Sequence, residues 1–114
     1  MITERTVLEL LKGHPERWTK HSMARNKAGK GYVASRVNEV HYDLCQWCLY
    51  GALCIVYENN LKSTHARPFY KIVAAVDAAI AKLYPNAHPG MINFNDLPTT
   101  KFEDVIAVLE EAQV

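Results

Sequence analysis

Residues 43–58 read Asp-Leu-Cys-Gln-Trp-Cys-Leu-Tyr-Gly-Ala-Leu-Cys-Ile-Val-Tyr-Glu, and this stretch decides the predicted fold. Almost every position between its two charged ends is apolar, so a helix formed here has no face suited to water. Asp43 can act as the N-cap, and Gln46 stands three residues later in a capping-box arrangement. Gly51 weakens a helix, and beside Ala52 it indicates a place where another backbone packs closely. We therefore predict a buried central helix over residues 43–58.

Three further helices are predicted on either side of this segment, so the expected fold is mainly α, with about four helices and the buried 43–58 helix in the middle. The first covers residues 3–12. A later helix begins at Pro68, a residue suited to the first helical position, and apolar residues then recur three and four positions apart. The last helix covers residues 101–112, and Thr100 with Glu103 is its predicted capping box.

The segment at 18–36 has no helical pattern of apolar residues, and its middle is rich in residues that favour turns. Asn26, Gly29 and Gly31 lie in that middle, and Tyr32 adds a preference for strand. We predict a short irregular β-hairpin or an ordered loop at 18–36. Two lysines at its tip could approach a phosphate, but the glycines do not have the spacing of a nucleotide-binding loop.

Length and composition set the class of protein. The chain has 114 residues, the size of a single domain covering residues 1–114, and 49% of them are hydrophobic, as in ordinary globular proteins. No apolar run reaches the roughly 20 residues that cross a membrane, and the charged start lacks the apolar core of a signal peptide. We expect a cytoplasmic protein of a bacterium or of a phage-infected cell.

The net charge of +1 hides an uneven distribution. Residues 13–36 carry six Lys or Arg against one Glu, and residues 96–114 carry five Asp or Glu against one Lys. These two ends could pack together or face water, or the basic one could bind an anion. Trp18 and Tyr32 lie among the cations, as a nucleotide or a single-stranded nucleic acid would need. The pI near 7.8 is low for a nucleic-acid domain, so we favour a protein partner or a small phosphate-bearing ligand.

Three cysteines fall within ten residues of the apolar segment, namely Cys45, Cys48 and Cys54. An odd number so close together is not the framework of a disulfide-rich secreted protein. Cys45 and Cys48 form a Cys-x-x-Cys, yet no second pair of Cys or His follows at the spacing of a zinc site. We expect buried, unpaired cysteines, and we predict no metal ion and no cofactor.

Cys48 is the sharpest candidate for catalysis, because a thiol near the start of a helix can be activated by the helix dipole and a neighbouring base. The histidines available as that base are His21, His41, His65 and His88. Asn95 or Asp96 could orient the base. The apolar neighbours of Cys48 raise the pKa of a thiol instead and make it inert. A small cysteine-dependent hydrolase or transferase is therefore the alternative to a binding domain.

Asn95 and Asp96 form the other polar feature, between apolar Phe94 and Leu97. One interpretation is a structural turn whose side chains bond backbone amides and the ends of neighbouring helices. The other is an amide and a carboxylate that contact a ligand. With the basic segment they complete the predicted ligand-binding residues, which are Trp18, Lys20, His21, Arg25, Lys27, Lys30, Asn95 and Asp96.

Several of these landmarks, taken in order, resemble a known family. They are Trp18, the string Cys48-Leu-Tyr-Gly51-Ala52-Leu53, Phe94-Asn95-Asp96 and Thr100, and they span nearly the whole chain. Their order and spacing resemble the small bacterial and phage domain of unknown function 6197. That family's pattern has Gly-Trp followed by Gln-Gly, where this sequence has Arg17-Trp18 and Lys20-His21, and it has Trp where this sequence has Phe94. The resemblance supports the fold and implies no activity.

These observations favour a small binding domain without catalytic activity, whose active surface includes the basic part of 17–36. We predict no membrane association and do not favour nucleic acid as the partner. A homo-oligomer is a further alternative, because the helix after Pro68 has faces made mostly of alanine that could pack between subunits.

Overall fold

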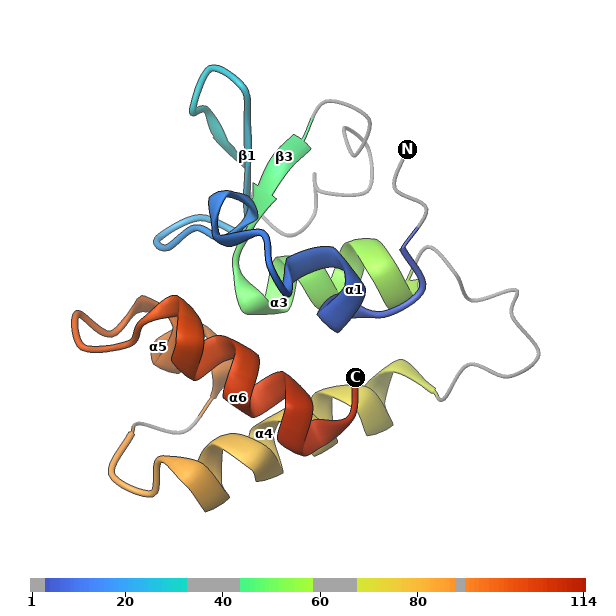
Figure 1. The fold of residues 1–114 in the computed structure, drawn as a ribbon, viewed down its shortest axis with the longest axis vertical. Coiled ribbons are helices and arrows are strands. Elements are labelled where there is room, and N and C mark those ends of the chain that lie inside the picture. The colour runs from blue at the N-terminus through green and yellow to red at the C-terminus, as the bar shows by residue number, and fades with distance from the viewer. Residues whose placement is uncertain (1–3, 33–43, 59–67, 88–89) are drawn as a thin grey trace.

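A three-stranded antiparallel sheet and a group of packed helices make up the fold (Figure 1). The computed structural model describes residues 4–32, 44–58, 68–87 and 90–114. Helices account for 56% of it, but the sheet makes the fold mixed α/β. The prediction of a mainly α fold is therefore wrong.

The sheet has the spatial order β2-β1-β3, with β1 in its centre. Its strands are β1, Ala24–Asn26, β2, Gly31–Tyr32, and β3, Leu44–Trp47. β1 and β2 form the hairpin predicted within 18–36, with Ala24 opposite Tyr32. Ala24 also pairs with Trp47 of β3, so the hairpin is one part of a larger sheet. Residues 33–36 of the predicted hairpin lie outside the described residues.

The predicted central helix is divided in the structure, which is a second correction. Its first residues form β3, and α3 begins only at Leu49 and ends at Leu53. A short apolar run fits a buried strand as well as a buried helix, so its periodicity could not separate the two. Gln46, predicted to cap the helix, instead donates a side-chain hydrogen bond to the Glu16 carbonyl at 3.1 Å. Asp43, the predicted N-cap, lies outside the described residues.

Cys48 occupies the N-cap of α3, and its sulfur accepts a hydrogen bond from the Gly51 amide at 3.3 Å. α3 continues into a π-helix, η3, over Cys54–Glu58. From 49 to 56 every residue is buried except half-buried Tyr50, as expected for a helix that is apolar all round. A Cβ added at Gly51 would lie 1.9 Å from the carbonyl oxygen of Met23, which confirms the predicted close backbone contact.

Helices α1 and α4 lie near their predicted positions. α1 is Val7–Leu11 and is capped by the hydroxyl of Thr6, so it begins later than predicted. A 3₁₀ turn, η1, follows at Pro15–Arg17. α4 is Phe69–Leu83, which starts directly after Pro68 and confirms the long amphipathic helix predicted there.

Two helices complete the C-terminal part, namely α5, Met91–Asp96, and α6, Phe102–Ala112. α5 was not among the predicted elements. The carboxylate of Asp104 accepts a hydrogen bond from the Lys101 amide at 2.9 Å, which makes Lys101 the N-cap. The Thr100 hydroxyl donates to the Phe94 carbonyl at 2.7 Å instead. The predicted capping box of Thr100 and Glu103 is therefore wrong, because α6 begins one residue later.

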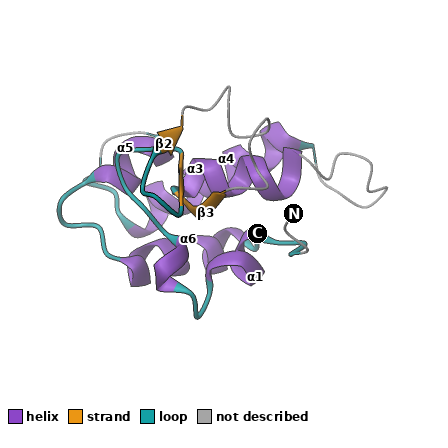
Figure 2. Ribbon diagram, turned by 90° about the horizontal axis from the view of Figure 1, so that it is seen from above, coloured by secondary structure: helices purple, strands orange, loops and turns teal. Residues whose placement is uncertain are grey.

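Apolar side chains from α1, α3, η3, α4, α5 and α6 share one core. The largest fully buried ones are Phe94, Leu10, Leu11, Leu49, Leu53, Ile55, Ile72 and Leu109. In Figure 1 the sheet lies on the side of α3 away from α4 and α6, and seen from above (Figure 2) the strands project over the middle of the helices. Within the described ranges, no helix is both long enough and apolar enough to cross a membrane.

Candidate functional site

Asn95 is completely buried, and every hydrogen-bonding position of its side-chain amide has a partner. Its side-chain oxygen accepts bonds from the Trp18 ring nitrogen at 2.6 Å and from the Leu49 amide at 3.0 Å. Its side-chain nitrogen donates to the Thr19 carbonyl at 3.1 Å and to the Asp96 carboxylate at 3.0 Å. Asn95 therefore fastens together the segment after η1, the first residue of α3, and α5.

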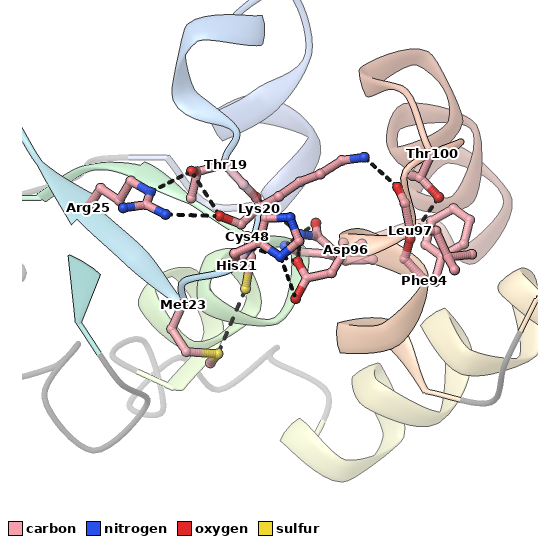
Figure 3. A network of polar contacts seen from close by, with 12 residues as sticks. Thr19, Lys20, His21, Met23, Arg25, Cys48, Phe94, Asp96, Leu97 and Thr100 are labelled. Atoms are coloured by element: carbon pink, nitrogen blue, oxygen red, sulfur yellow. Dashed lines mark hydrogen bonds and ion pairs between the residues drawn. The ribbon is translucent and has the colours of Figure 1, made fainter. Parts of the chain in front are cut away.

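The side chains of Asp96 and Lys20 add further hydrogen bonds to this junction (Figure 3). The Asp96 carboxylate accepts a hydrogen bond from the His21 amide at 2.9 Å, and its second oxygen lies 4.0 Å from His21 Nδ1. The Lys20 ammonium donates to the Leu97 carbonyl. These are bonds of the kind that the structural interpretation of Asn95 and Asp96 predicts. A contact of either residue with a ligand remains a prediction.

A pocket of about 320 Å³ opens beside the junction, where the β1–β2 hairpin, the start of α3 and α5 meet. The residues that line it are His21, Ser22, Met23, Gly31, Tyr32, Cys48, Ile92 and Asp96. Its volume lies at the lower end of the range for small-molecule sites. The structure thus brings to one pocket His21, Cys48 and Asp96, which the sequence offered together as a possible base, nucleophile and orienting group.

Cys48 lies in the wall of this pocket with only 3% of its surface exposed. Burial raises the pKa of the Cys48 thiol above its ordinary value, because a thiolate loses its water there. The Gly51 amide acts in the opposite direction, and the Asp96 carboxylate adds to the increase. The thiol is therefore protonated at neutral pH, as predicted for a cysteine among apolar neighbours. Of the four candidate bases, His41, His65 and His88 lie outside the described residues.

Comparison with known proteins gives a family match over nearly the whole chain. The model of a family described as "Family of unknown function (DUF6197)" matches residues 5–113. The chain belongs to this family. No curated protein and no solved structure matches it. The resemblance drawn from the short sequence strings is thereby confirmed.

His21 is one of the residues at which this DUF6197 member departs from the pattern that its sequence resembles, and its backbone conformation is unusual. Its backbone has φ of 66°, in the left-handed region that glycine adopts without strain. The resemblance places a glycine at this position, and glycine would adopt this conformation without strain. His21 is strained here by comparison, and its imidazole, with 71% of the side chain exposed, stands at the mouth of the pocket.

Two arginines of the basic segment are bound within the molecule. The Arg25 guanidinium donates to the Thr19 hydroxyl at 2.9 Å, to the Gly29 carbonyl at 3.0 Å and to the Lys20 carbonyl at 3.2 Å. Arg17 donates to the Leu10 carbonyl at 2.9 Å and pairs with Glu4 at 3.2 Å. These guanidinium groups hold the backbone of the segment in place, so an anion would have to compete with several existing bonds.

Trp18 and Lys20, which are predicted to contact a ligand, are in contact with each other, and their contact with a ligand remains a prediction. The Lys20 ammonium lies 5.5 Å from the centre of the Trp18 ring, and the centres of the Trp18 and Phe102 rings are 6.1 Å apart. Among the described residues of the segment, Lys27 and Lys30 at the tip of the hairpin are the exposed cations, and Lys30 lies over the Tyr32 ring at 5.4 Å.

Sequence reasoning missed three pocket residues, namely Ser22, Met23 and Ile92. None belongs to a motif, and a methionine at an irregular position gives no periodic signal. The one available signal was Gly51, whose predicted close contact is with the Met23 carbonyl. In the part of the chain that the structure describes, no group of three or more His, Cys, Asp or Glu side chains could hold a metal ion.

Proposed function

We propose that this chain is a non-catalytic binding domain whose ligand site is the pocket between the β1–β2 hairpin, the start of α3 and α5. The convergence of residues on this pocket supports the proposal. Five of its eight lining residues come from the segment 17–36 that the sequence favours for binding, and Asn95 holds that segment against α3 and α5. The site is thus pre-formed, which lowers the entropy cost of binding.

The walls of the pocket define the class of ligand. Met23, Tyr32 and Ile92 provide apolar surface, and Asp96 provides a carboxylate. The second oxygen of that carboxylate is 4.0 Å from His21 Nδ1, too far for a hydrogen bond, so it can accept one from a ligand. A small apolar molecule with a cationic or donor group fits this chemistry better than a phosphate, which the carboxylate would repel. Lys27 and Lys30 are the alternative surface for a phosphate-bearing partner.

A matched pair of probes tests the site. Benzylammonium and benzoate have similar size and opposite charge. Recording ¹H–¹⁵N spectra while the chain is titrated with each probe therefore distinguishes an effect of charge from an effect of shape. We expect benzylammonium to shift the amides of Ser22, Met23 and Tyr32, and benzoate to leave them in place. Adenosine monophosphate serves as the phosphate-bearing probe. Its binding at the hairpin tip would shift the amide signals of Lys27 and Lys30.

Two variants link the result to the pocket. Ile92→Trp should fill part of the pocket and abolish the benzylammonium shifts, whereas Tyr70→Trp, at a residue 70% exposed on α4, should leave them unchanged. Asp96→Asn should remove the preference for the cation. If no probe shifts these amides at about 10 mM, ten times the concentration that half-saturates a millimolar site, the pocket is not the ligand site. Shifts confined to Lys27 and Lys30 with the phosphate would move the site to the hairpin tip.

A second candidate function is a cysteine-dependent hydrolase or transferase, because Cys48, His21 and Asp96 line one pocket. In that arrangement the thiol would attack, the imidazole would take its proton, and the carboxylate would orient the imidazole. The rate of alkylation by iodoacetamide in the native protein separates the two functions. A binding domain predicts that Cys48 reacts more slowly than half-buried Cys45. Fast alkylation of Cys48 at neutral pH that His21→Asn abolishes would favour the enzyme.

A further inference from the structure

A second pocket, of about 450 Å³, lies between the end of α4 and the turn that leads from α5 into α6. Its lining shares no residue with that of the first pocket. The Tyr84 hydroxyl donates a hydrogen bond to the Asp104 carboxylate at 3.0 Å, so the residue after α4 and the first turn of α6 are joined in its wall. The volume lies within the range for small-molecule sites, and the bond keeps the pocket formed without a ligand.

The charge of this lining favours a neutral ligand. Among the described residues that line the second pocket, Asp104 is the one charged side chain, so a phosphate or a carboxylate would be repelled. The two Asp104 oxygens already accept bonds from the Tyr84 hydroxyl and, at 2.9 Å, from the Lys101 amide, so a cation would have to compete with both donors. Burial and the neighbouring carboxylate raise the pKa of Tyr84, so its hydroxyl stays uncharged at neutral pH.

Two polar side chains of the lining are available to a ligand. The Asn86 amide and the Thr99 hydroxyl are exposed, and within the described part of the chain neither makes a side-chain hydrogen bond. Each of them can both donate and accept a hydrogen bond, which are the two roles that the hydroxyl groups of a ligand also take. The Tyr84 ring, which packs on the Phe94 ring with centres 5.1 Å apart, adds an apolar surface.

A ring that carries hydroxyl groups, has an apolar C–H face and bears no charge matches this lining. We propose that the second pocket binds a neutral monosaccharide unit, with Asn86 and Thr99 bonding its hydroxyl groups and Tyr84 contacting its C–H face. The inference goes beyond the proposed function and does not rest on it, since it uses another pocket and other residues.

Sugars with the same kind of ring and different charge test the proposal. ¹H–¹⁵N spectra of the whole chain are recorded with the methyl glycosides of glucose, galactose and mannose. Glucuronate serves as the anion, and glucosamine, protonated at about pH 6, as the cation. We expect at least one methyl glycoside to shift the amides of Asn86, Thr99 and Lys101 until they saturate, and to leave those of Ser22 and Met23 in place. Glucuronate should shift none of them, and glucosamine should bind at least threefold more weakly than the glycoside.

Three variants connect the shifts to the second pocket. Asn86→Leu and Thr99→Val remove polar groups that bond no other described residue, so each variant should stay folded and bind the glycoside at least fivefold more weakly. Lys71→Leu introduces the same leucine at an exposed position of α4 outside the pocket, and it should bind as the unmodified chain does. Circular dichroism checks that all three variants are folded.

Four outcomes would overturn the sugar site. The first is that no glycoside shifts these amides at about 100 mM, ten times the concentration that half-saturates a site with a Kd of about 10 mM. The second is that either charged sugar binds as tightly as the neutral ones. The third is that Asn86→Leu or Thr99→Val binds as well as the unmodified chain, or that Lys71→Leu loses as much. The fourth is that the shifts are confined to Ser22, Met23 and Tyr32, which would place the sugar in the first pocket instead.

Discussion

The molecule has an apolar half around α4 and α6 and a polar half around Asn95, and different forces hold each of them together. α4 and α6 pack through apolar residues such as Ile72, Val76 and Leu109, which are fully or almost fully buried. The segment after η1 and the start of α3 are joined to α5 instead by polar bonds that converge on buried Asn95. Apolar contacts tolerate many side chains of similar volume, whereas a buried polar network needs every partner in place. The polar junction is therefore the part of the fold most sensitive to a single substitution, and it is the part beside the pocket.

Replacing Asn95 should have the largest effect on this comparison. Asn95→Leu leaves the buried Leu49 amide and the part-buried Trp18 ring nitrogen and Thr19 carbonyl without their partner. We expect the free energy of unfolding to fall by about 4 kcal/mol, measured by urea denaturation. Leu109→Ala in the apolar half is the matched variant, with an expected loss of about 3 kcal/mol.

The spectra of these two variants sharpen the contrast further. In Asn95→Leu, the amides of Ser22 and Met23 should shift, because the segment after η1 is released from α5. In Leu109→Ala they should stay in place. A loss below about 1 kcal/mol in Asn95→Leu would show that the polar junction contributes little to stability and that the comparison is mistaken.

Gly51→Ala should have the next largest effect. The added Cβ meets the Met23 carbonyl oxygen at 1.9 Å, and the backbone must move to relieve this contact. We expect a loss of about 2 kcal/mol in the free energy of unfolding, despite the better helix propensity of alanine. In Gly31→Ala the nearest atom is the Ser22 hydroxyl oxygen, which can rotate away, so this control should lose less. Equal losses would mean that the close backbone contact is not what Gly51 provides.

The raised pKa of Cys48 predicts a pH dependence of stability. At pH values above about 9 the unfolded chain ionises this thiol while the folded chain keeps it protonated. Protons are then bound more by the folded state, so stability falls as pH rises, by up to about 1 kcal/mol at pH 10. Thermal unfolding from pH 8 to 10 should show a shallower fall in Cys48→Ser, and Cys45→Ser should keep the original slope. A slope unchanged in Cys48→Ser contradicts the assignment.

His21→Gly should have the smallest effect and the opposite sign. The left-handed backbone costs a non-glycine residue roughly 1–2 kcal/mol, and the added flexibility of glycine in the unfolded chain offsets about half of the gain. We expect a net increase of about 0.5 kcal/mol in the free energy of unfolding. Gln113, with φ of 59° after α6, gives the matched variant Gln113→Gly in the apolar half. If only His21→Gly destabilises the chain, the imidazole itself supports the junction, through Asp96.

The difference between the halves also explains what could be predicted from the sequence. The spacing of apolar residues after Pro68 predicted α4, and the same kind of pattern predicted α6, because a helix with one buried face repeats that face locally. β3 was misread as helix because its pairing with β1 is a non-local choice that a uniformly apolar run does not record. α5 is only six residues long and has no repeat to detect.

The candidate site was predicted in part for the same reason. Trp18, His21 and Asp96 were singled out because their chemistry is visible one residue at a time, and the structure brings them to one junction. Two of the three partners of Arg25 could not be predicted, since they are carbonyl groups that any residue carries. Met23 could not be assigned to the pocket in advance, because its position depends on a contact between its backbone and that of Gly51, which is distant in the sequence.

The π-helix at η3 has a consequence for how this chain can change in length. Its hydrogen bonds span five residues where an α-helix spans four, so a π-helix holds one residue more than an α-helical turn in the same place. Deleting one residue within 54–58 would restore α-helical winding without moving Cys48 or β3, which precede it. One-residue gaps in alignments of DUF6197 sequences should therefore collect at η3, where an insertion of that size leaves the pocket as it was.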